Sequence, residues 1–166
     1  GLSGDILVTN NDPVGDGSLA AAVETANLRP GADTIRFADS VRGEIELDDE
    51  LVIVDDVTIR GPGAGKLTIS GGGEHRVFSI FSTDLESPID VEISRVTIAD
   101  GRATNAPEFE PIFAFGGGIY NLGSNVTLSR VRMVGNQAEG YVAAGGAVAN
   151  EFGGSLTIHR SELSGN

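Results

Sequence analysis

Three segments of the chain align with one another without gaps, and this repetition restricts the possible folds more than any other feature. They are VEISRVTIADG from Val91, VTLSRVRMVGN from Val126 and LTIHRSELSGN from Leu156. A fourth segment, VIVDDVTIRGP from Val52, fits the same frame, so the four starts are 39, 35 and 30 residues apart. A second motif, GGGIYN at 116–121, recurs as GGAVAN at 145–150. Repeats of this length are typical of folds in which like units stack on one another.

Apolar and polar residues alternate within each repeat, as in Val91/Ile93 and Val96/Ile98. A period of two is typical of β-strands, so each repeat predicts two short strands, and the GG motif predicts a third. Three short strands per repeat predict an all-β fold, a parallel β-solenoid of about five coils. An antiparallel sandwich is disfavoured, because the two-residue hairpin turns that it uses are missing between adjacent runs.

Residues 1–40 differ from the repeats and predict an N-terminal cap made of a strand, a helix and a second strand. Ser18 is a suitable N-cap for a helix over residues 18–29, in which Leu19, Val23 and Ala26 share one face. Such a helix would cover the aliphatic end of the first coil. Residues 41–166 are then the coils, with no comparable cap at their C-terminal end. We expect that end to continue into further coils or to stack end to end on another copy of the chain, as in a filament.

The charge balance argues against several classes of partner. The chain has 11 Lys and Arg and 24 Asp and Glu, and its net charge of −13 repels phosphate backbones and anionic membranes. We therefore expect no nucleic-acid partner. No apolar run reaches the roughly 18 residues of a membrane span. The absence of Cys excludes disulfides, zinc–thiolate sites, iron–sulfur clusters and Cys nucleophiles, and we expect no cofactor.

Two sets of motifs resemble known bacterial surface proteins. The segment GDGSLAAAVETANLRPGADTIRF, residues 15–37, resembles an N-terminal module that precedes a right-handed parallel β-helix in large proteins of this kind. The segments GGGIYN, GGAVAN, MVGNQA and SELSGN resemble the repeats of polymorphic outer-membrane proteins and autotransporter-type adhesins. The resemblance implies a right-handed helix with an N-terminal capping helix, an extracellular or cell-surface location, and a non-catalytic structural or adhesive function.

The repeat frame places Asp56, Arg95, Arg130 and Arg160 in one column, about 4.8 Å apart, at a corner of the solenoid. One interpretation is a basic stripe that binds a polyanionic glycan. A second is an arginine base of the kind that pectate-lyase-like β-helices use. The third is a solvated corner, in which Asp56 and Arg95 form a weak surface pair.

A polysaccharide lyase or hydrolase is the alternative class of function, and it needs two or three carboxylates from adjacent coils in one groove. The outward columns of the aligned repeats hold no two neighbouring acids. These columns are Glu92, Thr127 and Thr157, and then Thr97, Arg132 and Glu162. The two histidines, His75 and His159, are 84 residues apart and predict no metal site or triad. The sequence therefore assigns no catalytic residue.

Two longer stretches, residues 102–115 and 136–144, interrupt the repeats just before the GG motifs and should project side by side. They and their surroundings carry most of the aromatic residues, which makes them the candidate contact surface. The alternative is that these rings fold back on the solenoid wall as a satellite core. The residues concerned are Phe109, Phe113, Phe115, Tyr120 and Tyr141.

Asn residues recur at two repeat positions, in the pairs Asn121/Asn150 and Asn136/Asn166. We interpret both pairs as structural ladders of stacked amides that hydrogen-bond from coil to coil. The segment NNDPVGDG offers Asn10, Asp12 and Asp16 as oxygen ligands for Ca²⁺, but it is equally consistent with an Asx-turn loop before the helix.

Overall fold

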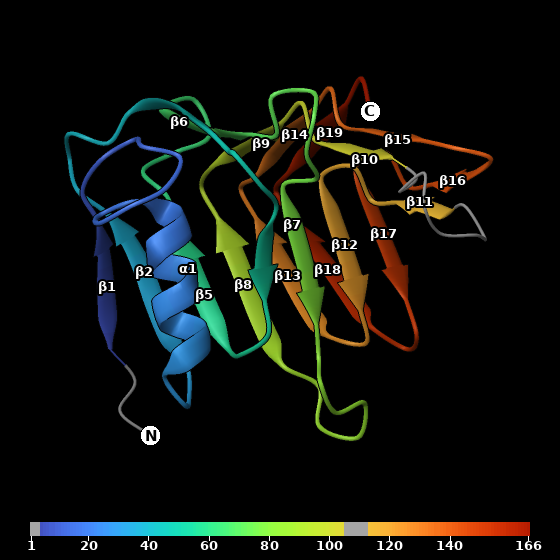
Figure 1. The fold of residues 1–166 in the computed structure, drawn as a ribbon, viewed down its shortest axis with the longest axis horizontal. Coiled ribbons are helices and arrows are strands. Elements are labelled where there is room, and N and C mark those ends of the chain that lie inside the picture. The colour runs from blue at the N-terminus through green and yellow to red at the C-terminus, as the bar shows by residue number, and fades with distance from the viewer. Residues whose placement is uncertain (1–3, 105–112) are drawn as a thin grey trace.

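The computed structural model describes residues 4–104 and 113–166, and these residues form parallel β-sheets with one helix (Figure 1). The chain passes through three main sheets in a fixed order, A, then B, then C, and repeats this order. Every strand pair among the described residues is parallel. The predicted all-β architecture of parallel sheets with one helix is confirmed.

Sheets A, B and C take one strand each from successive passes of the chain. Sheet A contains, in spatial order, β1 (Asp5–Val8), β2 (Asp33–Phe37), β5 (Val57–Arg60), β8 (Asp90–Ser94), β13 (Asn125–Ser129) and β18 (Ser155–His159). Sheet B contains β3 (Gly43–Glu46), β6 (Leu67–Ser70), β9 (Thr97–Ala99), β14 (Arg132–Val134) and β19 (Glu162–Ser164). Sheet C contains β4 (Leu51–Ile53), β7 (Phe78–Phe81), β12 (Ile119–Leu122) and β17 (Val148–Glu151).

Four further strands lie outside the main sheets and form what we call the arm. Strand β10 (Arg102–Thr104) pairs with β15 (Gln137–Glu139), and β11 (Phe113–Phe115) pairs with β16 (Val142–Ala144). Both insertions leave the repeat between sheet B and sheet C, and they extend to one side of the molecule (Figure 1). The two stretches that interrupt the repeats are therefore paired strand to strand.

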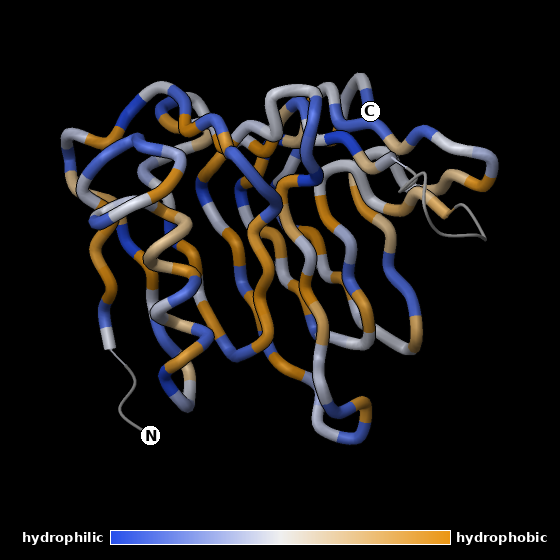
Figure 2. The backbone as a smooth tube through the Cα atoms, viewed as in Figure 1, coloured by the Kyte–Doolittle hydropathy of each residue, from blue (hydrophilic) through white to orange (hydrophobic). Residues whose placement is uncertain are grey.

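The core is aliphatic. Hydrophobic and hydrophilic residues alternate along the strands (Figure 2), and the aliphatic ones at alternate positions are buried. In sheet A, Ile35, Ile59, Ile93 and Leu128 are in register on successive strands, and all four are fully buried. Sheet B has an equivalent buried column of Ile45, Ile69, Ile98 and Met133. Aliphatic side chains at equivalent positions of successive strands stack on one another and fill the interior, so the chain needs few aromatic residues there.

The helix α1 (Leu19–Leu28) packs against β1, β2 and β4 and covers one end of the sheets. Ser18 is its N-cap, and its Oγ accepts a hydrogen bond from the Ala21 backbone N–H at 3.2 Å. The observed helix is one residue shorter at each end than the predicted range of 18–29, because Ser18 and Arg29 are cap residues with extended backbone. No helix among residues 4–104 and 113–166 is long and apolar enough to cross a membrane.

The alignment of the segment from Val52 with the other repeats is wrong. Val52 lies on β4 in sheet C, and it is Val57 that pairs with Val91 in sheet A. The alternation of apolar and polar residues is the same on every strand, so it does not distinguish sheet A from sheet B or C. The connection after β5 also has six residues, 61–66, where the connection after β8 has two.

Candidate functional site

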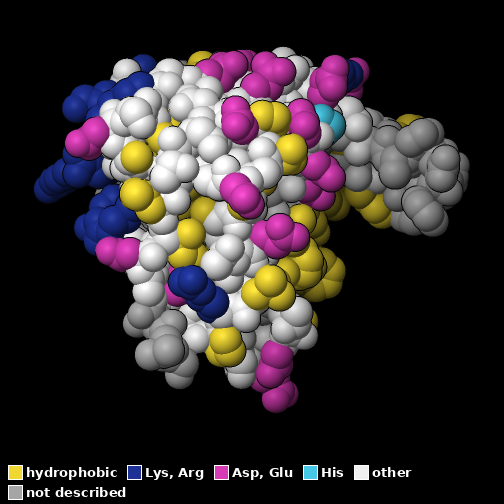
Figure 3. Space-filling model, turned by 60° about the vertical axis from the view of Figure 1, so that its left-hand side comes forward, with side chains coloured by type: hydrophobic (Ala, Val, Ile, Leu, Met, Phe, Trp, Pro, Cys, Tyr) yellow, Lys and Arg dark blue, Asp and Glu magenta, His cyan; other side chains and the backbone are white. Residues whose placement is uncertain are grey.

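Basic side chains concentrate where the chain passes from sheet A to sheet B. Each of the five connections between these sheets carries one Lys or Arg: Arg42, Lys66, Arg95, Arg130 and Arg160. These connections hold a single acidic residue, Asp39, although acids outnumber bases two to one in the chain. On the face drawn in Figure 3, Lys and Arg side chains gather along one edge, and Asp and Glu side chains spread over the rest.

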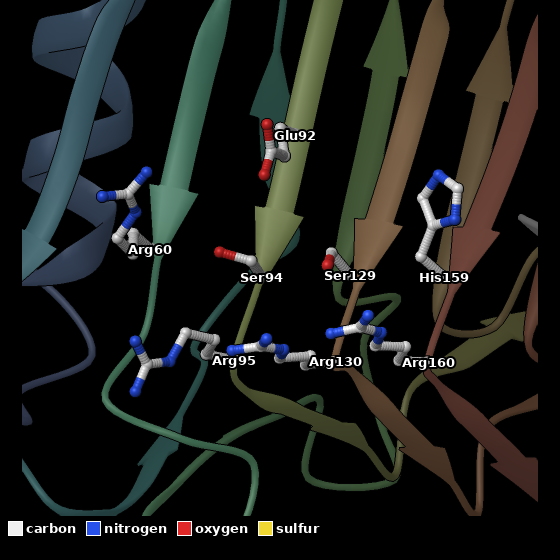
Figure 4. Close-up of a pocket in the computed structure, with 8 residues that line it drawn as sticks. All are labelled: Arg60, Glu92, Ser94, Arg95, Ser129, Arg130, His159 and Arg160. Carbon is white, nitrogen blue, oxygen red and sulfur yellow. The ribbon is translucent and has the colours of Figure 1, made fainter.

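Four arginines at this corner form the candidate site, which we call the arginine row: Arg60, Arg95, Arg130 and Arg160. The last three follow directly after β8, β13 and β18, whose final residues Ser94, Ser129 and His159 are in register. Arg60 ends β5 and pairs with Ser94, so it lies one residue earlier than the others. The three in-register side chains lie side by side in the close-up (Figure 4).

Asp56 does not belong to this column, and its predicted place there is wrong. Asp56 precedes β5, and its carboxylate accepts a hydrogen bond from the Asp90 backbone N–H at 2.7 Å. Because Arg60 pairs with Ser94, the residue opposite Arg95 is the next one, Gly61. The Gly61 backbone N–H donates to the Ser94 carbonyl at 2.8 Å. The error follows directly from the misaligned first repeat.

Three of the four arginines in the row have a left-handed backbone. Arg95, Arg130 and Arg160 have φ of 61°, 56° and 47°, a region that costs a residue with a side chain about 1 kcal/mol or more. Each of them begins a connection of only two residues, and a turn this tight requires the left-handed conformation. Sequence reasoning missed this feature because Gly, Asn and Asp usually occupy such positions. The recurring two-residue gap between alternating runs is the signal that could have found it.

Shallow grooves lie on both sides of the row. The first has a volume of about 460 Å³, and Ser94, Ser129 and His159 line it together with the row (Figure 4). Glu92 is the one acidic residue that lines this groove. The second groove, about 440 Å³, lies on the other side of Arg95, Arg130 and Arg160 and includes Arg132 and Glu162.

The arginine row has no ion-pair partner among the described residues. The Arg–carboxylate pairs found there involve other arginines: Arg36 with Asp5, Arg76 with Glu50, Arg102 with Glu139, and Arg132 with Glu162. Cations on neighbouring strands repel one another unless an anion lies between them. The row therefore presents four cations with no direct carboxylate partner among the described residues, along one corner of an acidic protein.

The predicted aromatic surface is only partly assembled. Phe113 and Phe115 stack with ring centroids 5.6 Å apart, and Phe115 lies 5.9 Å from Tyr120. Tyr141 is 90% exposed and belongs to neither of these ring pairs, and Phe109 lies outside the described residues. Phe115 and Tyr120 are partly buried at the base of the arm, which supports the satellite-core interpretation for them, whereas Phe113 and Tyr141 are exposed.

Arg76 anchors this base, and sequence reasoning missed it. Its guanidinium donates to the carbonyl of Phe115 at 2.8 Å, to that of Gly116 at 2.9 Å and to the Glu50 carboxylate at 2.9 Å. It also lies over the Tyr120 ring. Burial, and a hydrogen bond from the Tyr120 hydroxyl to Glu151, raise the pKa of Tyr120. No local pattern marks Arg76, since its carboxylate and carbonyl partners lie 26 to 40 residues away in the chain, and only Ser79, at 3.1 Å, is close in sequence.

Both Asn pairs make hydrogen bonds between neighbouring passes of the chain. The Asn121 side-chain amide donates to Asn150 at 2.6 Å, and that of Asn136 donates to Asn166 at 2.8 Å. Asn121 and Asn136 are fully buried. Asn136 also donates to the Ile98 carbonyl and accepts from the Gly101 N–H, so it serves three strands at once.

Asn10 uses its side chain within the Asn10–Asp16 loop, whereas Asn11 donates to the Arg42 and Glu44 carbonyls. The Asn10 side chain accepts from the Asp12 N–H at 3.0 Å and donates to the Asp16 carbonyl at 2.8 Å, which is an Asx-turn arrangement. Among residues 4–104 and 113–166, no three His, Cys, Asp or Glu side chains are grouped so that they could hold a metal ion.

One acidic groove was not anticipated. Glu44, Glu46 and Asp100 line a groove of about 360 Å³ on sheet B, together with Arg102. Glu46 ends β3 and Asp100 follows β9, so β6 lies between them and their backbones are about 10 Å apart. This separation is compatible with carboxylates that face a common ligand, which bears on the hydrolase alternative.

Comparisons of this chain with protein-family models, with curated proteins and with solved structures found no match.

Proposed function

We propose that this chain is a non-catalytic adhesive module of a secreted or cell-surface protein, and that it binds an acidic polysaccharide through the arginine row. The observation that carries the proposal is that each of the five connections from sheet A to sheet B contains one Lys or Arg. Four arginines at this corner have no carboxylate partner among the described residues, in a chain of net charge −13. A polyanion would supply the missing negative charge.

The proposed fold is a right-handed parallel β-helix in which each pass through sheets A, B and C is one coil, about five in all. Parallel strands joined by crossovers within one sheet are almost always right-handed, which supports this handedness. Such a solenoid displays equivalent residues at equal intervals along one corner, and this property suits it to repetitive ligands.

A polysaccharide fits the row better than a nucleic acid does. Single-stranded nucleic acids are held by aromatic side chains on which the bases stack. Neither groove beside the row is lined by Phe or Tyr. Serine hydroxyls from Ser94 and Ser129 line the first groove instead, and they suit the hydroxyl groups of a sugar.

End-to-end stacking into filaments is less well supported than ligand binding. Helix α1 packs on β1, β2 and β4 and so covers much of one end of the sheets. A second copy could extend the sheets at that end only if this helix moved or became part of the interface.

Binding to dextran sulfate, polygalacturonate and neutral dextran would test the proposed function, with affinity measured at low and high salt. We expect both acidic polymers to bind, neutral dextran not to bind, and affinity to fall as salt rises. The double variant R95Q/R130Q should bind at least about tenfold more weakly, because each charge-assisted hydrogen bond is worth roughly 1.5 kcal/mol. The control R29Q/R102Q removes two charges outside the row and also breaks the pair of Arg102 with Glu139, and it should bind like the unmodified chain if thermal unfolding shows that it is folded.

Two results would contradict the proposal. One is equal binding of neutral dextran, and the other is an equal loss of affinity in both double variants, which would indicate an effect of net charge alone. The hydrolase alternative is tested by the release of reducing ends from the same polymers. Release that is abolished by E46Q and by D100N would show that the acidic groove is catalytic.

A further inference from the structure

The arginine row has a direction and a spacing, and both restrict what can bind to it. Arg95, Arg130 and Arg160 occupy the same position after three neighbouring strands that are paired in register. Neighbouring strands lie about 4.8 Å apart, so the three side chains start from points on a line that crosses the strands at equal intervals. This line is parallel to the direction in which the coils stack (Figure 4).

Arg60 extends the row to a fourth strand. It ends β5, the neighbour of β8 in sheet A, and pairs with Ser94 rather than Arg95. The four arginines therefore span three strand spacings, about 14 Å, and Arg60 is displaced by one residue toward the sheet. A compact anion such as a single phosphate could contact only one or two of them.

A second row of polar groups runs beside the first. Ser94 and Ser129 are in register one residue before Arg95 and Arg130, and they face the same groove. Each of these two strands thus places one cation and one neutral hydroxyl in the groove lining, one strand spacing apart, with Ser129 half-buried and Ser94 6% exposed. A ligand that matches them has an acidic group and a hydrogen-bonding group in every repeat unit.

We infer that the ligand is an unbranched polysaccharide with one acidic group on every sugar, which lies across the strands of sheet A and contacts up to four arginines. This inference rests on the proposed function and makes it more specific. The repeat unit must advance by about one strand spacing, roughly 4.8 Å, so that each acidic group meets the next arginine. A polymer with a charge on every second sugar would leave alternate arginines without a partner.

The test is a length series of oligouronates, from one to eight sugars, with the dissociation constant of each measured by titration calorimetry. We expect affinity to rise with every added sugar up to about four and to change little beyond that. The number of salt ions released on binding should rise over the same range. Hyaluronan oligosaccharides, which carry a carboxylate on every second sugar, should bind more weakly at equal length and at equal charge.

Variants at the end and in the middle of the row should behave differently. R160Q shortens the row, so affinity should level off at about three sugars instead of four. R130Q interrupts the row, so affinity should fall for every oligomer longer than two sugars. The conservative variant R130K keeps the charge and should restore most of the affinity, whereas a purely structural effect of the substitution would not be restored. Thermal unfolding of each variant shows whether it is folded.

The outcomes separate this inference from the proposed function. If acidic polymers bind but affinity does not depend on length beyond one sugar, the row is a single anion site, and this inference is wrong while the proposed function stands. If no acidic polymer binds, both are wrong. Equally tight binding of single-stranded DNA of matched charge would also overturn the assignment of a polysaccharide.

Discussion

The guanidinium carbon of Arg76 lies 5.2 Å from the centroid of the Tyr120 ring, and this contact joins the segment just before β7 to β12, the neighbour of β7 in sheet C. Arg76 is 19% exposed at its side chain and also binds the carbonyls of Phe115 and Gly116, where the arm returns to the main sheets. A planar cation is required here, because donors on all three guanidinium nitrogens and the flat face are used together.

Replacement of Arg76 by Met should therefore destabilise the protein by about 2–3 kcal/mol, since two carbonyls would lose the guanidinium donor and the Glu50 carboxylate would keep only the Ser79 hydroxyl. Urea unfolding measures this change. The control is R36M, which breaks an exposed pair with Asp5 and should cost less than about 1 kcal/mol. Equal losses in the two variants would show that Arg76 has no special structural role.

The left-handed arginines should be replaceable with a gain in stability. Asn adopts the left-handed region more readily than Arg does, so R95N, R130N and R160N should each stabilise the protein by about 0.5 kcal/mol while polyanion affinity falls. Thermal unfolding and polymer binding measure the two effects separately. R132N, on strand β14, should give no such gain. Loss of stability in all three row variants would mean that their side chains stabilise the corner.

Glu92 lines the first groove and opposes an anionic ligand. Replacement of Glu92 by Gln removes one negative charge near the row, so affinity for polygalacturonate should rise by about two- to threefold at low salt. The control is E74Q, an exposed acid that lines neither groove beside the row. Unchanged affinity in E92Q would place the ligand outside the first groove.

Asn136 is fully buried and serves three strands, so its loss should be costly. In N136L the Gly101 N–H and the Ile98 carbonyl lose their partners, and we expect a destabilisation of about 2–4 kcal/mol in urea unfolding. N10A removes two exposed loop contacts and should cost less than about 1 kcal/mol. A small effect in N136L would show that the amide ladder contributes little.

The raised pKa of Tyr120 makes stability depend on pH in the alkaline range. The neutral form of Tyr is the protonated one, and the folded state retains it to higher pH than the unfolded state does. The unfolded chain therefore loses its proton first, and stability falls as pH rises above the ordinary Tyr pKa of about 10. The free energy of unfolding should fall less steeply in Y120F over this range. Y141F, at a 90% exposed position, should follow the unmodified chain.

The strand pattern and the capping helix follow from local sequence. Alternation of apolar and polar residues decides which side of a strand can be buried, and this holds at Val91/Ile93 as it does at Val126/Leu128. Ser18 caps α1 through a contact within three residues. Such features depend on near neighbours and can be predicted without knowledge of the rest of the chain.

Tertiary structure decided how the first strands of sheet A pair with the later ones, and therefore which residues belong to the arginine row. Alternation is the same on every strand, so it could not show that Val57, and not Val52, lies beside Val91. The length of each corner connection sets this register, and with it the partner of Asp56 and the position of Arg60. The contact of Arg76 with Tyr120 likewise exists only once distant strands have paired, whereas the left-handed backbone of Arg95 follows from the two-residue connection that it begins.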